Sequence, residues 1–449
     1  MNKTVDQPRV SPWSYIPTLY LPFGIIMGIG NSLPGMMFKL LGFSNEVVGM
    51  LAGIGLIASF RFVFAPWLDA AMTKRRLSLV TLIGAFTLAG GAAALIYAQP
   101  GQAVFLPAMV AILFVLAIVA ASHETAADGY YIRVLSPKRQ AEFIGIKTAA
   151  MRGGLVFTTM GLIYAATEIA KRYDAVNMES PDKTGFYIGF SIAFLLAAIT
   201  MLVCSIYNKF MIPKIPQDQP VKQDCSLVMA VAPVLKEYLL QHRVILIMLL
   251  ILLYRFGEGF LAMKGPFYLD PLADGGLASE ASDMPLYSIL TDLPWMILGG
   301  VLGGYVIKWW GLKRTFIPLA AFMSLPNLFY VWLAASQPMH QITLFGETLN
   351  SSLLIASSLE SLGYGMSFSA MFYYMHIMAT ECGKNKTSIL AISFALMNVG
   401  WTVPCMMSGF VQAHIGYMGV FIVSSTVGLT ALLIIPFLPM PNVEKKRAA

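Results

Sequence analysis

Long apolar runs separated by short polar segments fill almost the whole chain. A helix that crosses a lipid bilayer needs about 20 mostly apolar residues. Twelve runs meet this length, at 13–37, 46–67, 78–98, 103–133, 142–168, 185–207, 243–266, 284–307, 315–335, 349–378, 387–409 and 416–438. The first run is too long for the apolar part of a signal peptide, so we expect it to stay as a span. The pattern predicts an all-α polytopic membrane protein with twelve transmembrane helices.

The longest polar segment, Asn208–His242, divides these runs into six and six. We therefore expect an N-terminal six-helix half at 1–207, a linker at 208–242 and a C-terminal six-helix half at 243–449. Two halves joined by a long connection are typical of transporters built from parallel repeats.

Composition supports a membrane protein and sets its orientation. The chain is 57% hydrophobic and only 12% charged, whereas soluble proteins carry about 25% charged residues. The net charge of +7 is dispersed over short loops, which argues against a nucleic-acid-binding face. With a cytoplasmic N-terminus, twenty Lys and Arg residues fall in inner loops and four in outer loops, so both termini are predicted to be cytoplasmic.

The sequence indicates no cofactor or metal. Its four cysteines do not have metal-ligand spacing. It also has no Walker-type phosphate loop, so we do not expect ATP to drive it directly.

Ionisable groups inside the C-terminal spans are the first candidate site. Each costs about 2.5–3.5 kcal/mol on insertion scales and persists when it faces a cavity, has a partner or performs a function. Arg255 and Glu258 are three residues apart, so they can pair on one helix face. At similar depth lie Asp292, Glu360, Asn398 and Trp401. Such groups suit a ligand with many hydrogen-bonding groups and a ring, although a closed cluster of structural ion pairs would use the same residues.

A second set lies in the cytoplasmic half of the N-terminal spans. Glu124 and Asp128 share a helix face because they are four residues apart. The other members are the cations Arg61, Arg133, Lys147 and Arg152. The set predicts an inner gate or an anion-binding vestibule, with plain structural ion pairs as the alternative. His123 and Asp128 have the spacing of an acyltransferase motif but diverge around a helix, so we do not expect an enzyme.

The loop after the second span carries a motif. Pro66-Trp67-Leu68-Asp69, followed by Lys74-Arg75-Arg76, resembles the loop motif of the major facilitator superfamily. The resemblance implies the major facilitator fold and a gating role for Asp69 and Arg75. The basic pair recurs as Lys313 and Arg314, at the same offset of 239 residues (313 − 74 and 314 − 75), which extends the gating prediction to that pair.

Other stretches resemble one branch of this superfamily more closely. They are Leu21-Pro22-Phe23-Gly24, Phe60-Arg61-Phe62-Val63-Phe64-Ala65-Pro66-Trp67-Leu68-Asp69, Ala121-Ser122-His123-Glu124-Thr125-Ala126-Ala127-Asp128-Gly129-Tyr130-Tyr131 and Leu359-Glu360-Ser361-Leu362-Gly363-Tyr364-Gly365. These are similar to AmpG-type muropeptide permeases and their acetyl-CoA and siderophore transporter relatives. The sequence departs from the permeases at Arg61, where a lysine is expected, and in the order His123-Glu124.

The resemblance implies a secondary active transporter of the bacterial inner membrane, acting as a monomer. We expect proton-coupled inward movement of a small saccharide-containing solute such as a muropeptide, with Glu360 as the best proton-sensitive candidate. A siderophore is the alternative cargo. The rival classes are a membrane sensor without turnover and a membrane-embedded transferase.

Overall fold

The computed structural model describes residues 10–60, 68, 71–220, 235–344, 346–381 and 386–439. The chain forms two compact units. Unit 1 comprises Met1–Met37, Phe60–Ala175 and Ser180–Asp224, and unit 2 comprises Phe38–Ser59, Val176–Glu179 and Cys225–Ala449.

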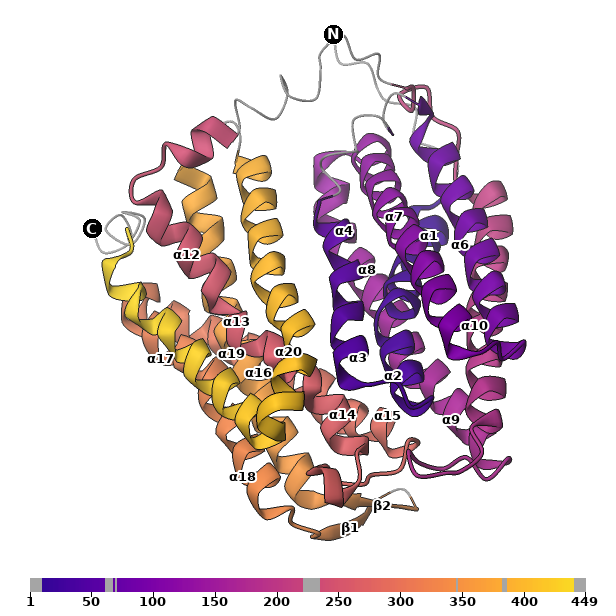
Figure 1. The fold of residues 1–449 in the computed structure, drawn as a ribbon. Coiled ribbons are helices and arrows are strands. Elements are labelled where there is room, and N and C mark those ends of the chain that lie inside the picture. The colour runs from indigo at the N-terminus through magenta and orange to yellow at the C-terminus, as the bar shows by residue number, and fades with distance from the viewer. Residues whose placement is uncertain are drawn as a thin grey trace, which may run out of the picture. The chain divides into compact units, whose positions relative to one another are not determined.

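Unit 1 is built from long helices, coloured indigo to magenta in Figure 1. They are α1 (Pro12–Gly30), the first part of α2 (Ser32–Leu40), α6 (Lys74–Tyr97), α7 (Gln102–Val134), α8 (Pro137–Val156), the π-helical turn η2 (Phe157–Leu162), α9 (Ile163–Lys171) and α10 (Thr184–Met211). Helix α1 packs against α8. A Cβ atom at Gly24 would strike the Met151 carbonyl, and one at Gly28 would strike Thr158. The close approach of α1 to α8 and η2 therefore depends on glycine at positions 24 and 28.

Unit 2 holds the later helices and one small sheet. It begins with α3 (Asn45–Leu51), η1 (Ala52–Gly55) and α4 (Leu56–Ser59). The later elements are α12 (Val244–Tyr254), α13 (Phe256–Phe260), η3 (Leu261–Met263), α14 (Lys264–Leu269), η4 (Leu272–Asp274), α15 (Asp283–Tyr287), η5 (Ser288–Asp292), α16 (Leu293–Trp310), α17 (Leu312–Ser324), η6 (Leu325–Asn327), α18 (Leu328–Ser336), β1 (Gln341–Leu344), β2 (Glu347–Asn350), α19 (Ser351–Glu381), α20 (Lys386–Thr430), η8 (Ala431–Leu433) and η9 (Ile435–Phe437). Strands β1 and β2 are antiparallel, with Gln341 opposite Asn350.

Glycines set the close packing of α16 on α19. A Cβ atom at Gly299 or Gly303 would strike the carbonyl of Leu362 or Met366. Gly304, in contrast, has nothing within 4 Å, and Gly300 has only ordinary contact distance to a side chain. Neighbouring positions on a helix point about 100° apart, so Gly299 and Gly303 share the face of α16 that meets the α19 backbone.

The apolar runs predicted as spans are largely helical. Among the described residues, nine helical stretches are long and apolar enough to cross a membrane. One of them, Ile389–Phe437, covers two predicted spans, which meet at Gly416, where φ is +69°. The predicted span 349–378 corresponds to α19. The predicted span 46–67 runs from α3 beyond the described residues.

Candidate functional site

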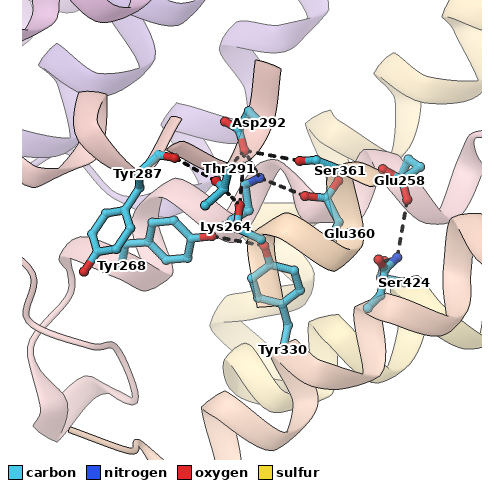
Figure 2. A network of polar contacts seen from close by, with 12 residues as sticks. Glu258, Lys264, Tyr268, Tyr287, Thr291, Asp292, Tyr330, Glu360, Ser361 and Ser424 are labelled. Carbon is cyan, nitrogen blue, oxygen red and sulfur yellow. Dashed lines mark hydrogen bonds and ion pairs between the residues drawn. The ribbon is translucent and has the colours of Figure 1, made fainter. Parts of the chain in front are cut away.

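Lys264 lies at the centre of a polar network in unit 2 (Figure 2). Its Nζ donates to Glu360 Oε2 at 3.0 Å and to Asp292 Oδ1 at 3.3 Å. The Glu360 side chain is 10% exposed, the Lys264 side chain 22% and the Asp292 side chain 39%. Two carboxylates thus share one ammonium group, so the network holds one more acidic group than basic group.

Hydroxyl groups complete the hydrogen bonding of Asp292. Its Oδ1 accepts from Ser357 at 3.1 Å, from Ser361 at 3.4 Å and from Thr291 at 3.3 Å. Ser357 and Ser361 are four residues apart and therefore share the face of α19 that meets the π-helical turn η5. Single π-helical turns are frequent at functional sites.

Two tyrosines lie beside this network in Figure 2. The Tyr268 and Tyr330 hydroxyl groups are 3.1 Å apart, and their rings stack with centroids 6.5 Å apart. Both side chains are buried. One of the two hydroxyl groups donates to the other.

Glu258 is buried. The sequence suggested that it pairs with Arg255, but its hydrogen bond comes from another residue. Asn327 donates to Glu258 Oε1 at 3.4 Å and to Ser424 Oγ at 3.0 Å. The backbone at Arg255 has φ −104° and ψ 8°, which ends α12 and starts α13. This break changes the regular i,i+3 geometry, so no ion pair or hydrogen bond joins the two side chains, although Arg255 still attracts Glu258 electrostatically.

Arg255 instead contacts aromatic rings. Its guanidinium carbon lies 5.6 Å from the centroid of Tyr364, 5.6 Å from that of Phe368 and 5.2 Å from that of Trp401. We call these four residues the Arg255 box. The structure thus brings the predicted residues Arg255 and Trp401 together, whereas Asn398, three residues before Trp401 on α20, is half-buried.

The predicted N-terminal set is only partly assembled. Asp128 Oδ1 accepts from Lys147 Nζ at 2.6 Å and from the Tyr20 hydroxyl at 2.8 Å. Lys147 also lies 4.8 Å from the Tyr20 ring centroid. Glu124 is half-buried one turn earlier on α7, whereas Arg152 is exposed on α8 and makes no contact in this cluster. Arg61 lies outside the described residues.

His123 is separate from Asp128. It is fully buried, with Nδ1 2.9 Å from Thr81 Oγ1 and Nε2 3.0 Å from the Leu19 carbonyl oxygen. A histidine held in this way orders the packing of three helices. The acyltransferase interpretation has no geometric basis here.

Of the predicted gating residues, Arg75 makes the most contacts. Its Nε donates to the Ile212 carbonyl at 2.8 Å, and its backbone N–H donates to Asp218 Oδ2 at 2.9 Å. Asp218 Oδ1 accepts from the Lys74 backbone at 2.8 Å and pairs with Arg133 at 3.1 Å. The segment after α10 is thereby fastened to the start of α6.

The other predicted gating residues that the structure describes are Lys313 and Arg314. Lys313 and Arg314 are exposed at the start of α17. Asp69 lies outside the described residues.

A buried polar network that sequence reasoning missed ties α2 and α3 to the later helices of unit 2. Lys39 Nζ pairs with Asp270 at 2.5 Å and donates to Asn45 Oδ1 at 2.6 Å. Asn45 Nδ2 donates to Gln412 Oε1 and to the Tyr417 hydroxyl, both at 2.9 Å, and Tyr417 in turn donates to Asp270. The Lys39 and Asp270 side chains are 6% and 8% exposed.

A cavity of about 330 Å³ lies elsewhere in unit 2. Leu277–Glu280 and the β1–β2 hairpin line much of it, and none of the predicted pathway residues does.

Lys264 is the functional candidate that sequence reasoning missed. Its signal was present, because it is a lysine within the seventh predicted span. Its two acids are 28 and 96 residues away, so local spacing could not identify them.

Two known transport proteins are similar to this chain along most of its length. The chain is 22% identical to a transporter named AmpG 1 from Rickettsia prowazekii, covering 94% of this chain and 97% of that protein. It is 23% identical to the anhydromuropeptide permease of Escherichia coli K12, covering 92% of this chain and 78% of the permease. These relatives are named as transporters or permeases and not as enzymes. No family model matches the chain.

Solved structures identify the fold. A D-xylose-proton symporter superposes with a TM-score of 0.68 at 14% identity, covering 95% of this chain and 97% of the symporter. A transporter of the POT family, in complex with 5-aminolevulinic acid, superposes with a TM-score of 0.64 at 11% identity, covering 96% of this chain and 98% of that one. The predicted fold class and the predicted resemblance are confirmed: the chain is a polytopic membrane protein with the major facilitator fold, similar along most of its length to AmpG-type anhydromuropeptide permeases.

Proposed function

We propose that this protein is a secondary active transporter that carries a muropeptide-type solute inward across the bacterial inner membrane, driven by protons. The observation that carries the proposal is the Lys264–Asp292–Glu360 network, in a chain similar to an anhydromuropeptide permease. Ionisable groups within membrane spans typically belong to substrate or proton pathways.

Glu360 is the proposed proton acceptor. Its carboxylate is the less exposed of the two acids that share Lys264. When a proton neutralises Glu360, Lys264 keeps Asp292 as its partner, so one ion pair remains. Proton uptake and release at this point can therefore bias the transporter between two states without leaving a lone buried charge.

The other predicted residues complete the proposed pathway. Substrate would pass the C-terminal groups Arg255, Glu258, Asn398 and Trp401, and the N-terminal groups Arg61, Glu124, Asp128 and Arg152. Asp69, Arg75, Lys313 and Arg314 are the proposed gating residues on the cytoplasmic side. Asp69→Asn should preserve folding and expression and slow uptake, and unchanged uptake at equal expression would remove Asp69 from the gate.

The proposed arrangement follows the charge pattern. Both termini face the cytoplasm, because the inner loops carry most Lys and Arg residues. The two functional halves are 1–207 and 243–449, joined by the linker 208–242, and they alternate access around the site as a monomer.

Uptake into proteoliposomes tests the function directly. The purified protein is reconstituted into vesicles, and radiolabelled anhydromuropeptide is added to the external solution. The external solution is made more acidic than the vesicle interior. Accumulation above equilibrium that a protonophore abolishes supports the proposal. A sensor would show binding without accumulation, and accumulation of a ferric siderophore alone would replace the proposed cargo.

A further inference from the structure

Glu258 is a buried carboxyl group that joins no ion pair among the described residues. It is 7% exposed and belongs to α13, in the region drawn in Figure 2. Its hydrogen bond from Asn327 is 3.4 Å long, whereas N–H···O bonds are typically about 2.7–3.2 Å. Asn327 Nδ2 also donates to Ser424, whose hydroxyl donates to the Gly257 carbonyl. These contacts hold Glu258 in place but give its carboxyl group little stabilisation as an anion.

The charges around Glu258 leave the cluster with one acid in excess. Arg255 and Lys264 attract it, and Glu360 repels it. Cys405 of α20 is a further titratable group that interacts with it. Lys264 already pairs with two other carboxylates, so three acids share two cations. The cluster therefore becomes neutral when one of its acids binds a proton.

Arg255 is three residues from Glu258, yet it donates no hydrogen bond to it. Arg255 Nε is buried without a hydrogen-bond partner, and the guanidinium lies against the rings of the Arg255 box. Ring faces attract a cation and offset part of its desolvation, but a buried donor without an acceptor remains costly. An ionised carboxylate could accept two parallel hydrogen bonds from the guanidinium. A protonated, neutral Glu258 explains why Arg255 stays on the rings.

From this arrangement we infer that Glu258 is a second proton-binding carboxyl group, and that its ionisation moves Arg255 from the aromatic rings to an ion pair with Glu258. The structure corresponds to the protonated form. When the O–H bond of Glu258 breaks, the electron pair stays on the carboxylate, the proton passes to water, and N–H groups of Arg255 take its place. Proton uptake reverses these steps. The inference rests on the proposed function for the direction in which the proton travels, and it adds a second proton site and a moving cation.

Glu258 and Glu360 bind one proton between them. Because the two carboxyl groups repel each other as anions, a proton on one favours the ionised form of the other. A proton on Glu258 leaves Glu360 paired with Lys264, as observed. A proton on Glu360 leaves Glu258 to pair with Arg255. The two arrangements have equal charge and differ in the position of Arg255, so the cluster has two states that a proton or a substrate can bias.

Trp401 reports the position of Arg255. Its ring centroid lies 5.2 Å from the guanidinium carbon, and a charge over an indole ring alters the emission of that ring. The chain has seven tryptophans, and all except Trp401 are replaced with Phe. Emission is then recorded against pH in the detergent-solubilised protein. We expect one transition, fitted by one proton, as Glu258 ionises and Arg255 leaves the rings.

Substitutions in this background identify the titrating group. Glu258→Gln should abolish the transition, and Glu258→Asp should retain one because it keeps a carboxyl group. Glu360→Gln removes a neighbouring negative charge, so Glu258 ionises more readily and the transition should move about 1–3 pH units lower. Glu168→Gln is the matched control, since it removes a glutamate that pairs with Lys171 on α9, and it should leave the transition unchanged.

The pH dependence of unfolding is a second measurement that needs no tryptophan replacement. A proton that the folded protein holds on Glu258 and the unfolded chain releases makes the stability of the wild-type protein fall as the pH rises through the transition. Glu258→Gln should lose this decline. Identical pH profiles of the unfolding temperature in both proteins overturn the inference.

The outcomes separate this inference from the proposed function. A transition that persists in Glu258→Gln, or the absence of any transition in a folded protein, overturns the inference even if muropeptide accumulates in vesicles. A transition that depends on Glu258 supports the inference even if no accumulation is seen, and in that case the proposed function is what fails.

Discussion

Replacing Glu360 with Gln is the most informative perturbation of the Lys264 network. Each carboxylate attracts the Lys264 ammonium by about 5 kcal/mol at 3.0–3.3 Å if the effective dielectric constant is about 20. Glu360→Gln removes one of these attractions. It also removes the electrostatic repulsion between the Glu360 and Asp292 carboxylates, which offsets part of the loss. The net loss of stability should therefore be smaller than the about 3–5 kcal/mol that breaking a buried pair costs, because Asp292 still pairs with Lys264.

The magnitude of the transport effect follows from the charge balance. With one carboxylate more than ammonium groups, the network becomes neutral after taking up one proton. One proton per substrate across one pH unit supplies about 1.4 kcal/mol, which sustains about tenfold accumulation. In the Glu360→Gln variant the network is neutral without a bound proton, so substrate should accumulate only to about equilibrium. Exchange of labelled for unlabelled substrate should continue, because it needs no net proton movement.

The assay compares the two processes in the same vesicles. Uptake is driven by acidifying the outside by one pH unit, and exchange is measured with equal pH on both sides. Glu168→Gln is the matched control, because it also removes a glutamate from a lysine pair, at 3.4 Å from Lys171, outside the proposed pathway. If Glu360→Gln still concentrates substrate tenfold, Glu360 is not the coupling residue, and Asp292→Asn becomes the variant to test.

Lys264→Ala should behave in the opposite manner. It leaves two acids without their shared cation, and removing one partner of a buried pair costs about 3–5 kcal/mol. The expected result is a lower unfolding temperature and loss of both uptake and exchange. Adding Glu360→Gln to Lys264→Ala should recover part of the stability, and no recovery would contradict the proposed charge balance.

Three further predictions concern topology and packing. In a protein without native cysteines, Gln217→Cys should be labelled by impermeant reagents from the cytoplasmic side and Asp274→Cys from the outside, since both positions are exposed; labelling of both from one side would refute the orientation. Asp218→Ala should lower unfolding stability by about 1–2 kcal/mol, measured by thermal unfolding, because Asp218 accepts from the first backbone N–H groups of α6. Gly303→Ala should destabilise by about 1–3 kcal/mol, whereas Gly304→Ala should be nearly neutral, because only the first position faces the α19 backbone; equal effects would contradict this packing.

The sequence was sufficient for the helical elements because lipid imposes a simple rule on length and polarity. Most predicted spans correspond to observed helices, and the intramembrane position of Glu360 and Asp292 could be read from depth along the chain. Their shared partner, Lys264, could not be identified from the sequence, because the pairing depends on which helices pack together. Glu360 has no cation nearby in sequence, and its partner Lys264, which lies 3.0 Å from it, comes from 96 residues away.

Backbone irregularities account for the other errors. The i,i+3 rule assumes an unbroken helix, and the break at Arg255 brings that side chain against Trp401. The glycines that face a neighbouring helix, here Gly299 and Gly303 against α19, likewise depend on the rotation of the helix about its axis. A run that is hydrophobic on all sides does not determine the rotation of its helix about the helix axis to within one residue.

The Lys39–Asn45 network has a consequence for biosynthesis. Asn45 and its partner Gln412 are separated by 367 residues, and a ribosome that adds about 5–20 residues per second needs roughly 20–70 s to make that length. Asp270 follows Asn45 by 225 residues, so Lys39 lies at the membrane without its acidic partner for roughly 10–45 s of this time. A lone charge there costs about 2.5–3.5 kcal/mol. The nascent N-terminal helices should therefore depend on insertion factors until Asp270 has been added, and variants of Asp270 should reduce the amount of protein made before they alter its activity.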